Sequence, residues 1–446
     1  MSDGTAVLER VTDERATNTP LLESFAERDD LPAWFIEQQR AGWAEFSKLP
    51  MPARKDQAWR FSNVDALKLD GYVRAPQLDE ATRGELLDQS SGLAQSAARL
   101  VFADEQLVER DVIRESLRDR GVIFQPMERA IIEHEELVRQ YFMAEPATLG
   151  SAKFAALHRA FVSSGAFLYV PRGVEIELPI EIYHWIATPH AAVFPHLLLV
   201  AGEMSKVTVV EYFRSAENAP GFACGVNDLI VGRGANVRYV CVQDWSERVV
   251  ALQVNATRVE RDASAMSLNI NAGASYARLE SRSRLVGEGA RSDMLAVGIA
   301  NGRREFDART LQDHERPHTT SDLLYKNALE ENARTTFGGL IRVEPHAHFT
   351  DAYQTVRNLL LSDDAEANSM PGLEIMADNV KCSHGATSGQ IDEEEMFYLL
   401  SRGIPPATAK RLIAAGFLDE VIARLSHDAI SDHLRQLIAR KFRASG

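Results

Sequence analysis

The sequence predicts a mixed α/β protein in which a parallel β-helix core, residues 166–388, lies between helical segments at both ends. Three observations support this prediction. Short stretches of alternating apolar and polar residues follow one another from about residue 167 to residue 380, as expected for strands with one buried face. Similar turns recur between these stretches, which is typical of stacked repeats. Apolar residues at helical spacing dominate the segments before and after this region.

The N-terminal domain, residues 1–165, is expected to be mostly helical. A helix is predicted to open at residues 31–36, to continue through Trp43 and to end before Pro50, because proline cannot continue a helix interior. Trp59 and Phe61 are predicted to anchor the next segment on the main body. A strand at residues 99–102 and helices at about 127–142 and 152–162 are expected to follow.

Alanines mark the recurring turns of the core. Ala235, Ala263 and Ala290 follow polar or glycine-containing turns at intervals of 28 and 27 residues. Later copies, at Ala333, Ala347 and Ala365, lie closer together. Because alanine fits a corner where backbones pack tightly, we interpret these turns as corners of coils of about 30 residues. Seven or so coils at a spacing of roughly 4.8 Å would form a rod about 35 Å long.

An antiparallel sandwich is the alternative fold, since it also produces many short alternating strands. The recurring turns and the scarcity of Asn-Gly and Asp-Gly hairpin dipeptides favour the β-helix. A β-helix also has an edge problem, because its last coil exposes unpaired backbone N–H and C=O groups. The segment ending at residues 380–384 lies at that terminus, so strand addition by another subunit, and hence a dimer, is expected there.

The C-terminal domain, residues 389–446, is predicted to be helical. Asp392 is a candidate N-cap, with Glu395 three residues later in capping-box register, and Gly403 suits the helix end. Pro405 and Pro406 suit the first turn of a second helix. We expect a small helical bundle that leaves part of its apolar surface for a partner.

Composition narrows the class of protein. The 446 residues are 45% hydrophobic and 25% charged, as in ordinary soluble proteins. The net charge of −15 argues against nucleic acid or an anionic membrane as the main partner, because both require clustered cations. Three cysteines make no disulfide framework, the start has no signal-peptide pattern, and no apolar run is long enough for a membrane helix. A cytoplasmic location is therefore predicted.

Cys382 and His384 form the strongest candidate site. If they lie on a strand, residues two apart project from the same face, while Ser383 points the other way. Thiolate and imidazole suit iron–sulfur clusters and zinc. Two ligands cannot close a four-coordinate site, so a second chain would have to supply the others. On residue types alone, a buried inert thiol beside a histidine bonded to backbone is the more common situation.

Several segments around this pair follow a known pattern, namely Cys-Ser-His-Gly-Ala-Thr at 382–387, Phe-Tyr-Leu at 397–399, Ser-Arg-Gly at 401–403 and Thr-Asp-Ala-Tyr-Gln at 350–354. In these segments the chain resembles the SufB/SufD family of iron–sulfur cluster assembly scaffolds, and its SufD branch in particular. The chain departs from relatives at Val356, Met370 and Ser388, where they usually carry Asn, Lys and Val. SufB proteins usually have an acidic-His-Glu run at 382–385 and a cysteine near Val356, so both differences favour SufD.

The resemblance implies a right-handed parallel β-helix and a non-catalytic scaffold role. It implies a heterodimer with the SufB paralogue and a complex with the SufC ATPase. No tightly bound cofactor is expected. A transient iron ion or iron–sulfur cluster shared with SufB is expected instead. Cys382 and His384 would then lie at the SufB interface, with His384 taking part in nascent cluster assembly. The C-terminal helices, with Phe397, Leu400 and Phe417, would dock SufC.

Other candidate residues are interpreted as structural. The pairs His346/His348 and His314/His318 have spacings that could bind metal, but the first falls at a repeat turn and Pro317 argues against a helix at the second. Cys224 and Cys241 have apolar neighbours and are expected in the core. The acidic run at 392–395 suits a helix N-terminus. The sequence contains no Walker A motif, so ATP hydrolysis would have to come from another protein.

Two further functions are compatible with the sequence. A carbohydrate-active β-helix enzyme, a lyase or hydrolase, would use paired carboxylates on one strand face. No aromatic-lined strand face or secretion signal supports that class. A metal-binding homodimer of isolated chains, paired through the same open edge, is the other alternative.

Overall fold

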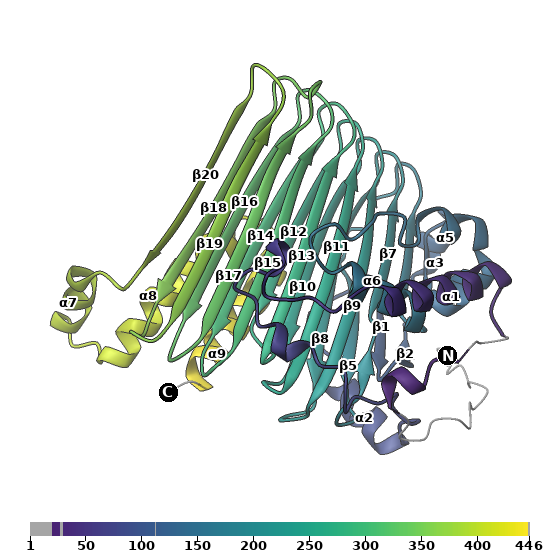
Figure 1. Ribbon diagram of the computed structural model, residues 1–446, viewed down its shortest axis with the longest axis horizontal. Helices are drawn as coiled ribbons and strands as arrows, with labels where there is room; N and C mark the ends of the chain where they lie inside the picture. Colours follow the sequence, from purple (N-terminus) through teal and green to yellow (C-terminus); the bar gives the residue numbers. More distant parts are fainter. Residues whose placement is uncertain (1–19, 27–29, 112, 445–446) are drawn as a thin grey trace.

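The computed structural model describes residues 20–26, 30–111 and 113–444, and two long sheets dominate it (Figure 1). The first sheet has the strand order β2-β1-β5-β8-β10-β12-β14-β16-β18-β20. Its strands are β1 (Ala98–Ala103), β2 (Gln106–Arg110), β5 (Ile180–Ile186), β8 (Lys206–Ser215), β10 (Asn236–Asp244), β12 (Ser264–Asn271), β14 (Arg291–Ala300), β16 (Thr320–Leu329), β18 (Asp351–Leu360) and β20 (Lys381–Gly389).

The second sheet has the order β19-β17-β15-β13-β11-β9-β7-β4-β3, with β6 beside β9. Its strands are β3 (Ile123–Pro126), β4 (Ala166–Val170), β6 (Ala192–Val193), β7 (His196–Ala201), β9 (Gly221–Val231), β11 (Val249–Val259), β13 (Tyr276–Leu285), β15 (Glu305–His314), β17 (Arg334–Val343) and β19 (Glu366–Ile375). From β8 onward the chain alternates between the sheets at every strand, and neighbours within a sheet are parallel. This arrangement confirms the predicted parallel β-helix and excludes the antiparallel sandwich.

The recurring alanines lie at the corners of the coils, as predicted. All six are buried, and the backbone N–H of each donates to the carbonyl three residues earlier, for example Ala235 to Gly232 at 2.9 Å and Ala263 to Glu260 at 3.2 Å. Because a larger side chain has no room at such a buried corner, alanine is the residue that suits these six turns between the sheets.

The N-terminal end of the β-helix is closed by antiparallel strands. β2 pairs antiparallel with β1, and β3 pairs antiparallel with β4. The outermost strand at this end of each sheet therefore runs opposite to its neighbour. The region before residue 165 therefore contributes three strands to the sheets. Its helical elements are η1 (Leu21–Glu23), α1 (Ala33–Lys48), η2 (Gln57–Trp59), η3 (Val64–Leu67), α2 (Glu80–Gln89), α3 (Glu115–Arg118), α4 (Met127–Glu133), α5 (Glu135–Tyr141) and α6 (Ala152–Phe161).

N-terminal helices cover the outer face of the second sheet. α1 packs against α6, and α6 packs against β9. A continuous apolar cluster joins this layer to the sheet through residues such as Phe35, Phe154 and Phe222, each at most 1% exposed. Burial of this apolar area is the main force that holds the N-terminal segment on the β-helix.

The C-terminal region has three helices, α7 (Glu393–Ser401), α8 (Pro406–Ala423) and α9 (Asp428–Ala444). The Asp392 carboxylate accepts hydrogen bonds from the N–H groups of Glu394 and Glu395, and Gly403 has φ of +80°, so the predicted helix ends are confirmed. α8 packs against β14 and β16, and both α8 and α9 join an apolar cluster on the first sheet. α8 and α9 thus pack on each other as well as on the sheet, while α7 projects beyond the last strands (Figure 1).

Candidate functional site

Cys382 and His384 lie on β20, the last strand of the first sheet. In the parallel register Cys382 is opposite Ala352 and His384 is opposite Gln354, both of which are buried on the inner face of β18. Ser383 is opposite Tyr353, which is 44% exposed on the outer face. Thiol and imidazole therefore project from the same inner face, as the i, i+2 spacing predicts.

Both sheets end in an uncovered strand, and we refer to β19 and β20 together as the open end. Within residues 113–444, β20 is hydrogen-bonded to β18 on one side and β19 to β17 on one side, with no strand beyond either. Leu373 and Ile375 are in register with Ile341 and Val343, which are fully buried, yet they are 37% and 42% exposed. The inner face of the last coil thus lacks the covering layer that every earlier coil has.

The two ends of the β-helix therefore differ. Antiparallel strands and helices close the N-terminal end, whereas the open end presents an unpaired backbone edge (Figure 1). Exposed apolar side chains lie beside that edge. An unpaired edge of this kind is a template for pairing with another chain. The structure places Cys382 and His384 on that template.

The surroundings of Cys382 hold its thiol in the protonated form. Cys382 packs against the small apolar cluster that contains Ala347 and Ala352, and this burial, followed by the negative charge of Asp351, raises the pKa of the thiol. Because the thiolate is the metal ligand, binding of iron or zinc here has to displace a proton. In the part of the chain that the structure describes, no three His, Cys, Asp or Glu residues are grouped as a metal site. Cys382 and His384 can therefore supply part of a ligand set.

We expect iodoacetamide to modify Cys382 alone among the three cysteines of the native protein, because Cys224 and Cys241 are buried. Since alkylation requires the thiolate and the pKa of Cys382 is raised, its rate should still rise with pH above about pH 8.5, the ordinary pKa of a free cysteine. Asp351→Asn should increase the rate at a given pH by removing the nearby negative charge. Peptide mass spectrometry measures both effects, and equal rates for the two proteins would contradict the role of Asp351.

The remaining cysteines and histidines have structural surroundings. Cys224 is buried under α6, where its thiol donates to the Phe154 carbonyl at 3.3 Å, and Cys241 lies inside the β-helix. His314 is fully buried, bonded to the hydroxyls of Thr319 and Ser321, and burial lowers its pKa to about 3. The structural interpretation of the cysteines and of His314 is confirmed.

The histidines near the repeat turns also lie where the sequence predicts. His346 and His348 are in the turn between β17 and β18, and His348 Nδ1 lies 3.1 Å from the Asp378 carbonyl oxygen. The ring of His318 stacks on Phe349 at 4.9 Å in a turn, not in a helix. None of these rings forms part of a metal-binding group among the described residues.

The predicted docking residues fall in two different settings. Phe397 and Leu400 lie on α7 and are 72% and 38% exposed, next to Tyr398, which is 56% exposed. Phe417 lies on α8 against the first sheet, with Lys326 Nζ 4.3 Å from the centre of its ring. α7 thus presents an apolar surface to solvent, while Phe417 anchors α8 to the β-helix.

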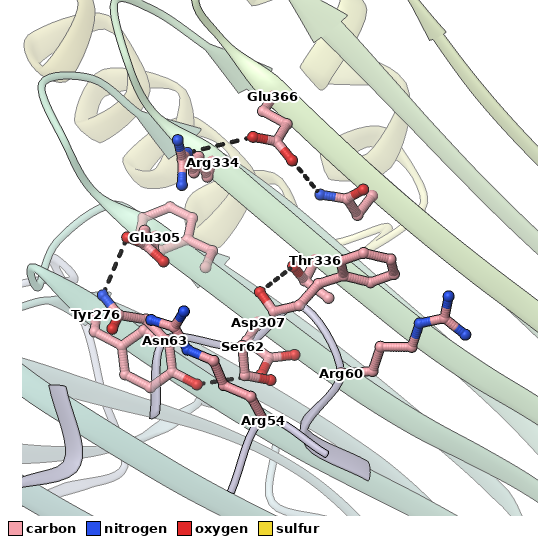
Figure 2. A pocket seen from close by; sticks show the side chains of 13 residues that line it. Arg54, Arg60, Ser62, Asn63, Tyr276, Glu305, Asp307, Arg334, Thr336 and Glu366 are labelled. Carbon is pink, nitrogen blue, oxygen red and sulfur yellow. Dashed lines mark hydrogen bonds and ion pairs between the residues drawn. The ribbon is translucent and has the colours of Figure 1, made fainter. Parts of the chain in front are cut away.

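A polar cavity of about 490 Å³ lies between the loop at residues 54–63 and the outer face of the second sheet (Figure 2). Its carboxylates are Glu305, Asp307 and Glu366. Asp307 accepts bonds from Ser62 and Arg278 at one oxygen and from Arg309 at the other, so its charge is already neutralised. A carboxylate bound in this way is a poor general base or nucleophile, so Asp307 does not favour a carbohydrate-active enzyme.

Comparison with known sequences identifies the family of the chain. Residues 184–417 match the family described as "SUF system FeS cluster assembly, SufBD core domain". Residues 28–182 match the "SufBD protein N-terminal region". The chain belongs to the SufBD family. It is therefore a protein of the SUF system of iron–sulfur cluster assembly.

Individual SufBD proteins are similar along almost the whole chain. The iron–sulfur cluster assembly protein SufD of Bacillus subtilis is 30% identical over 437 residues, which cover 94% of this chain and 97% of that protein. The SufB protein of the same organism is 25% identical, covering 91% of this chain and 89% of SufB. A SufBD family protein of Staphylococcus saprophyticus is also 25% identical. The higher identity to SufD supports the SufD branch. None of the helices in residues 20–26, 30–111 and 113–444 is both long and apolar enough to cross a membrane.

Sequence reasoning missed part of the open end of this SufBD protein. Leu373 and Ile375 alternate with polar residues in β19, a pattern that predicts burial, but the structure leaves both exposed. The alternation shows which residues share a face, not whether another layer covers it. The signal that could have identified them was their position in the last strand of the second sheet.

Proposed function

We propose that this protein is a non-catalytic, SufD-like scaffold subunit of the SUF system, which pairs with a SufB paralogue through the open end and docks the SufC ATPase through its C-terminal helices. Its membership of the SufBD family and its identity to SufD support the system and the branch. The absence of a Walker A motif from the sequence is consistent with a separate ATPase.

The observation that carries the proposal is the open end. A SufB strand that paired with β19 or β20 would satisfy the backbone groups of that edge and cover Leu373, Ile375 and Met376, the last of which is 44% exposed. Backbone hydrogen bonds and apolar burial together are the usual basis of strand addition between chains.

In this proposal the cluster, or its iron, is cargo and not a resident cofactor. Cys382 and His384 would contribute a thiolate and an imidazole, and SufB would contribute the remaining ligands. A site shared between two chains can release its cargo when the chains move apart. ATP-driven movement of SufC, transmitted through the C-terminal helices, would supply that motion, provided that the interface has two arrangements.

The test is co-purification of the tagged chain with SufB and SufC from the same organism. We expect both proteins to be recovered in a stable complex. Recovery of neither would refute the proposal. Size-exclusion chromatography with elemental analysis distinguishes this complex from the alternative, a metal-binding homodimer. The homodimer would elute as a dimer of this chain with stoichiometric metal.

For the docking of SufC, we expect Phe397→Asp to reduce SufC recovery at least tenfold without lowering the melting temperature, because a 72% exposed side chain contributes little to folding. The matched control is Ile132→Asp on α4, where a 56% exposed apolar residue is replaced far from the C-terminal helices. Pull-down with tagged SufC measures both variants. Unchanged SufC recovery by Phe397→Asp would show that docking lies elsewhere.

A further inference from the structure

Charged side chains on the outer face of the second sheet form rows that run across its strands. In the first row the parallel register aligns Glu305 of β15, Arg334 of β17 and Glu366 of β19. Arg334 Nε lies 3.4 Å from a Glu366 carboxylate oxygen, and the charge of Arg334 also lowers the pKa of Glu305, although burial raises it more. Figure 2 shows these side chains along one side of the polar cavity.

The second row has the same alternation. Arg284 of β13, Asp313 of β15, Arg342 of β17 and Glu374 of β19 are aligned by the register. Arg342 Nε lies 3.0 Å from a Glu374 carboxylate oxygen, and hydrogen bonding to Glu374 raises the pKa of Arg342, with Asp313 adding to the shift. Each acid inside the rows is thus followed by a base on the next strand.

Both rows stop at a carboxylate on the edge strand. Glu366 and Glu374 have an arginine on the β17 side, and the other side faces the unpaired edge of β19. Glu366 also accepts a hydrogen bond from the Asn368 side chain on the same strand, at 2.7 Å. Their side chains are 50% and 48% exposed, so in the isolated chain water solvates them. A strand added to β19 would place its own side chains directly opposite, about 5 Å away, and would remove much of that water. An acidic neighbour would then repel both carboxylates, and an uncharged neighbour would leave each of them with its β17 arginine as the one adjacent cation.

The two strands of the open end do not supply a cation opposite each carboxylate. A second copy of β19 presents the same carboxylates. The outer face of β20 carries one cation, Lys381, followed by Ser383, Gly385 and Thr387. Self-pairing through the open end therefore leaves at least one of the two carboxylates without a basic residue on the added strand, whether that strand is β19 or β20.

We infer that the strand that pairs with β19 belongs to a different chain and carries two basic residues on its outer face, eight residues apart, opposite Glu366 and Glu374. The inference rests on the proposed function and specifies the chemistry of its partner surface. The two ion pairs between these basic residues and Glu366 and Glu374 fix the register of the added strand. A shift of two residues separates both pairs, and a shift of one residue turns the basic side chains to the inner face. They also select the heterologous partner over a second copy of this chain.

The double variant Glu366→Lys/Glu374→Lys tests the inference, with the SufB paralogue of the same organism as the probe. We expect its dissociation constant for SufB to rise at least tenfold at low salt, and this difference to shrink as salt increases. The control is Glu217→Lys/Glu288→Lys, which makes the same change in net charge at solvent-accessible turns of earlier coils. Calorimetry or interferometry measures both affinities, and circular dichroism checks the fold.

A charge swap on the partner completes the test. Replacing the two basic residues of the SufB edge strand with glutamate should weaken binding to the natural chain and restore binding to Glu366→Lys/Glu374→Lys. If the double variant binds SufB as tightly as the control, the inference is wrong, while the pairing itself stands. If the unaltered chain does not bind SufB at all, the proposed function is refuted.

Discussion

His384→Ala should abolish iron–sulfur cluster assembly by the complex and leave the fold unchanged. The imidazole is exposed on the inner face of β20, beneath no further coil, so its removal creates no cavity and should change the free energy of unfolding by less than about 0.5 kcal/mol. The same position at the open end makes it available to a cluster held between two chains. We expect at least a tenfold loss of cluster delivery.

The measurement is complementation in a strain that lacks its own copy of the gene, read as the activity of an iron–sulfur enzyme, with the melting temperature of the purified variant alongside. His346→Ala is the matched control, since it removes another exposed histidine from a neighbouring turn. Normal cluster delivery by His384→Ala would disprove the assignment of the site. A lowered melting temperature would instead assign His384 a structural role.

Arg278→Ala should have the largest effect on stability, with a loss of about 3–5 kcal/mol. The guanidinium is fully buried between Glu280, at 2.7 Å, and Asp307, at 2.5 Å. It also donates to the carbonyls of Ala58 and Leu149 and lies 3.7 Å from the centre of the Trp59 ring. Its removal leaves Glu280 without its buried cation and releases the loop at residues 54–63, which lines the polar cavity.

Urea unfolding followed by circular dichroism and tryptophan fluorescence measures this loss. Arg435→Ala is the control, because the ion pair of Arg435 with Asp419 is about half exposed on the C-terminal helices and should contribute less than about 1 kcal/mol. Three of the five tryptophans, Trp34, Trp43 and Trp59, lie in the N-terminal segment, so the fluorescence change should begin with detachment of this segment, before the β-helix unfolds. A loss below about 1 kcal/mol for Arg278→Ala would show that the buried network does not hold this segment in place.

The strands, corners and helix ends of this SufBD protein could be predicted because they depend on local rules. Alternation gave the strands, the buried alanines gave the corners, and Asp392 and Gly403 gave the ends of α7. The placement of Cys382 and His384 on one face follows from the period of a strand alone. The C-terminal helices were predicted, but the packing of α8 and α9 on the first sheet was not, because an apolar helix face does not say whether it packs on a helix or on a sheet.

The buried network of Arg278 and Asp307 could not be predicted, since its members are separated by about the length of one coil and also join Ser62 and Trp59 from the N-terminal region. Such contacts depend on which coil stacks on which, and on where a distant loop crosses the sheet. The charge rows that end at Glu366 and Glu374 could not be predicted either, because they are recognised only when the parallel register of the strands is known.

By itself, the sequence determined the repeating coil, the direction in which each side chain points from its strand, and a likeness to scaffolds of iron–sulfur cluster assembly. The tertiary structure alone decided which inner faces remain uncovered. Burial depends on the presence of a next layer, and β19 and β20 have none, whereas β2 and β3 close the other end. A thiol and an imidazole that would be core residues one coil earlier are therefore presented at the surface of the protein.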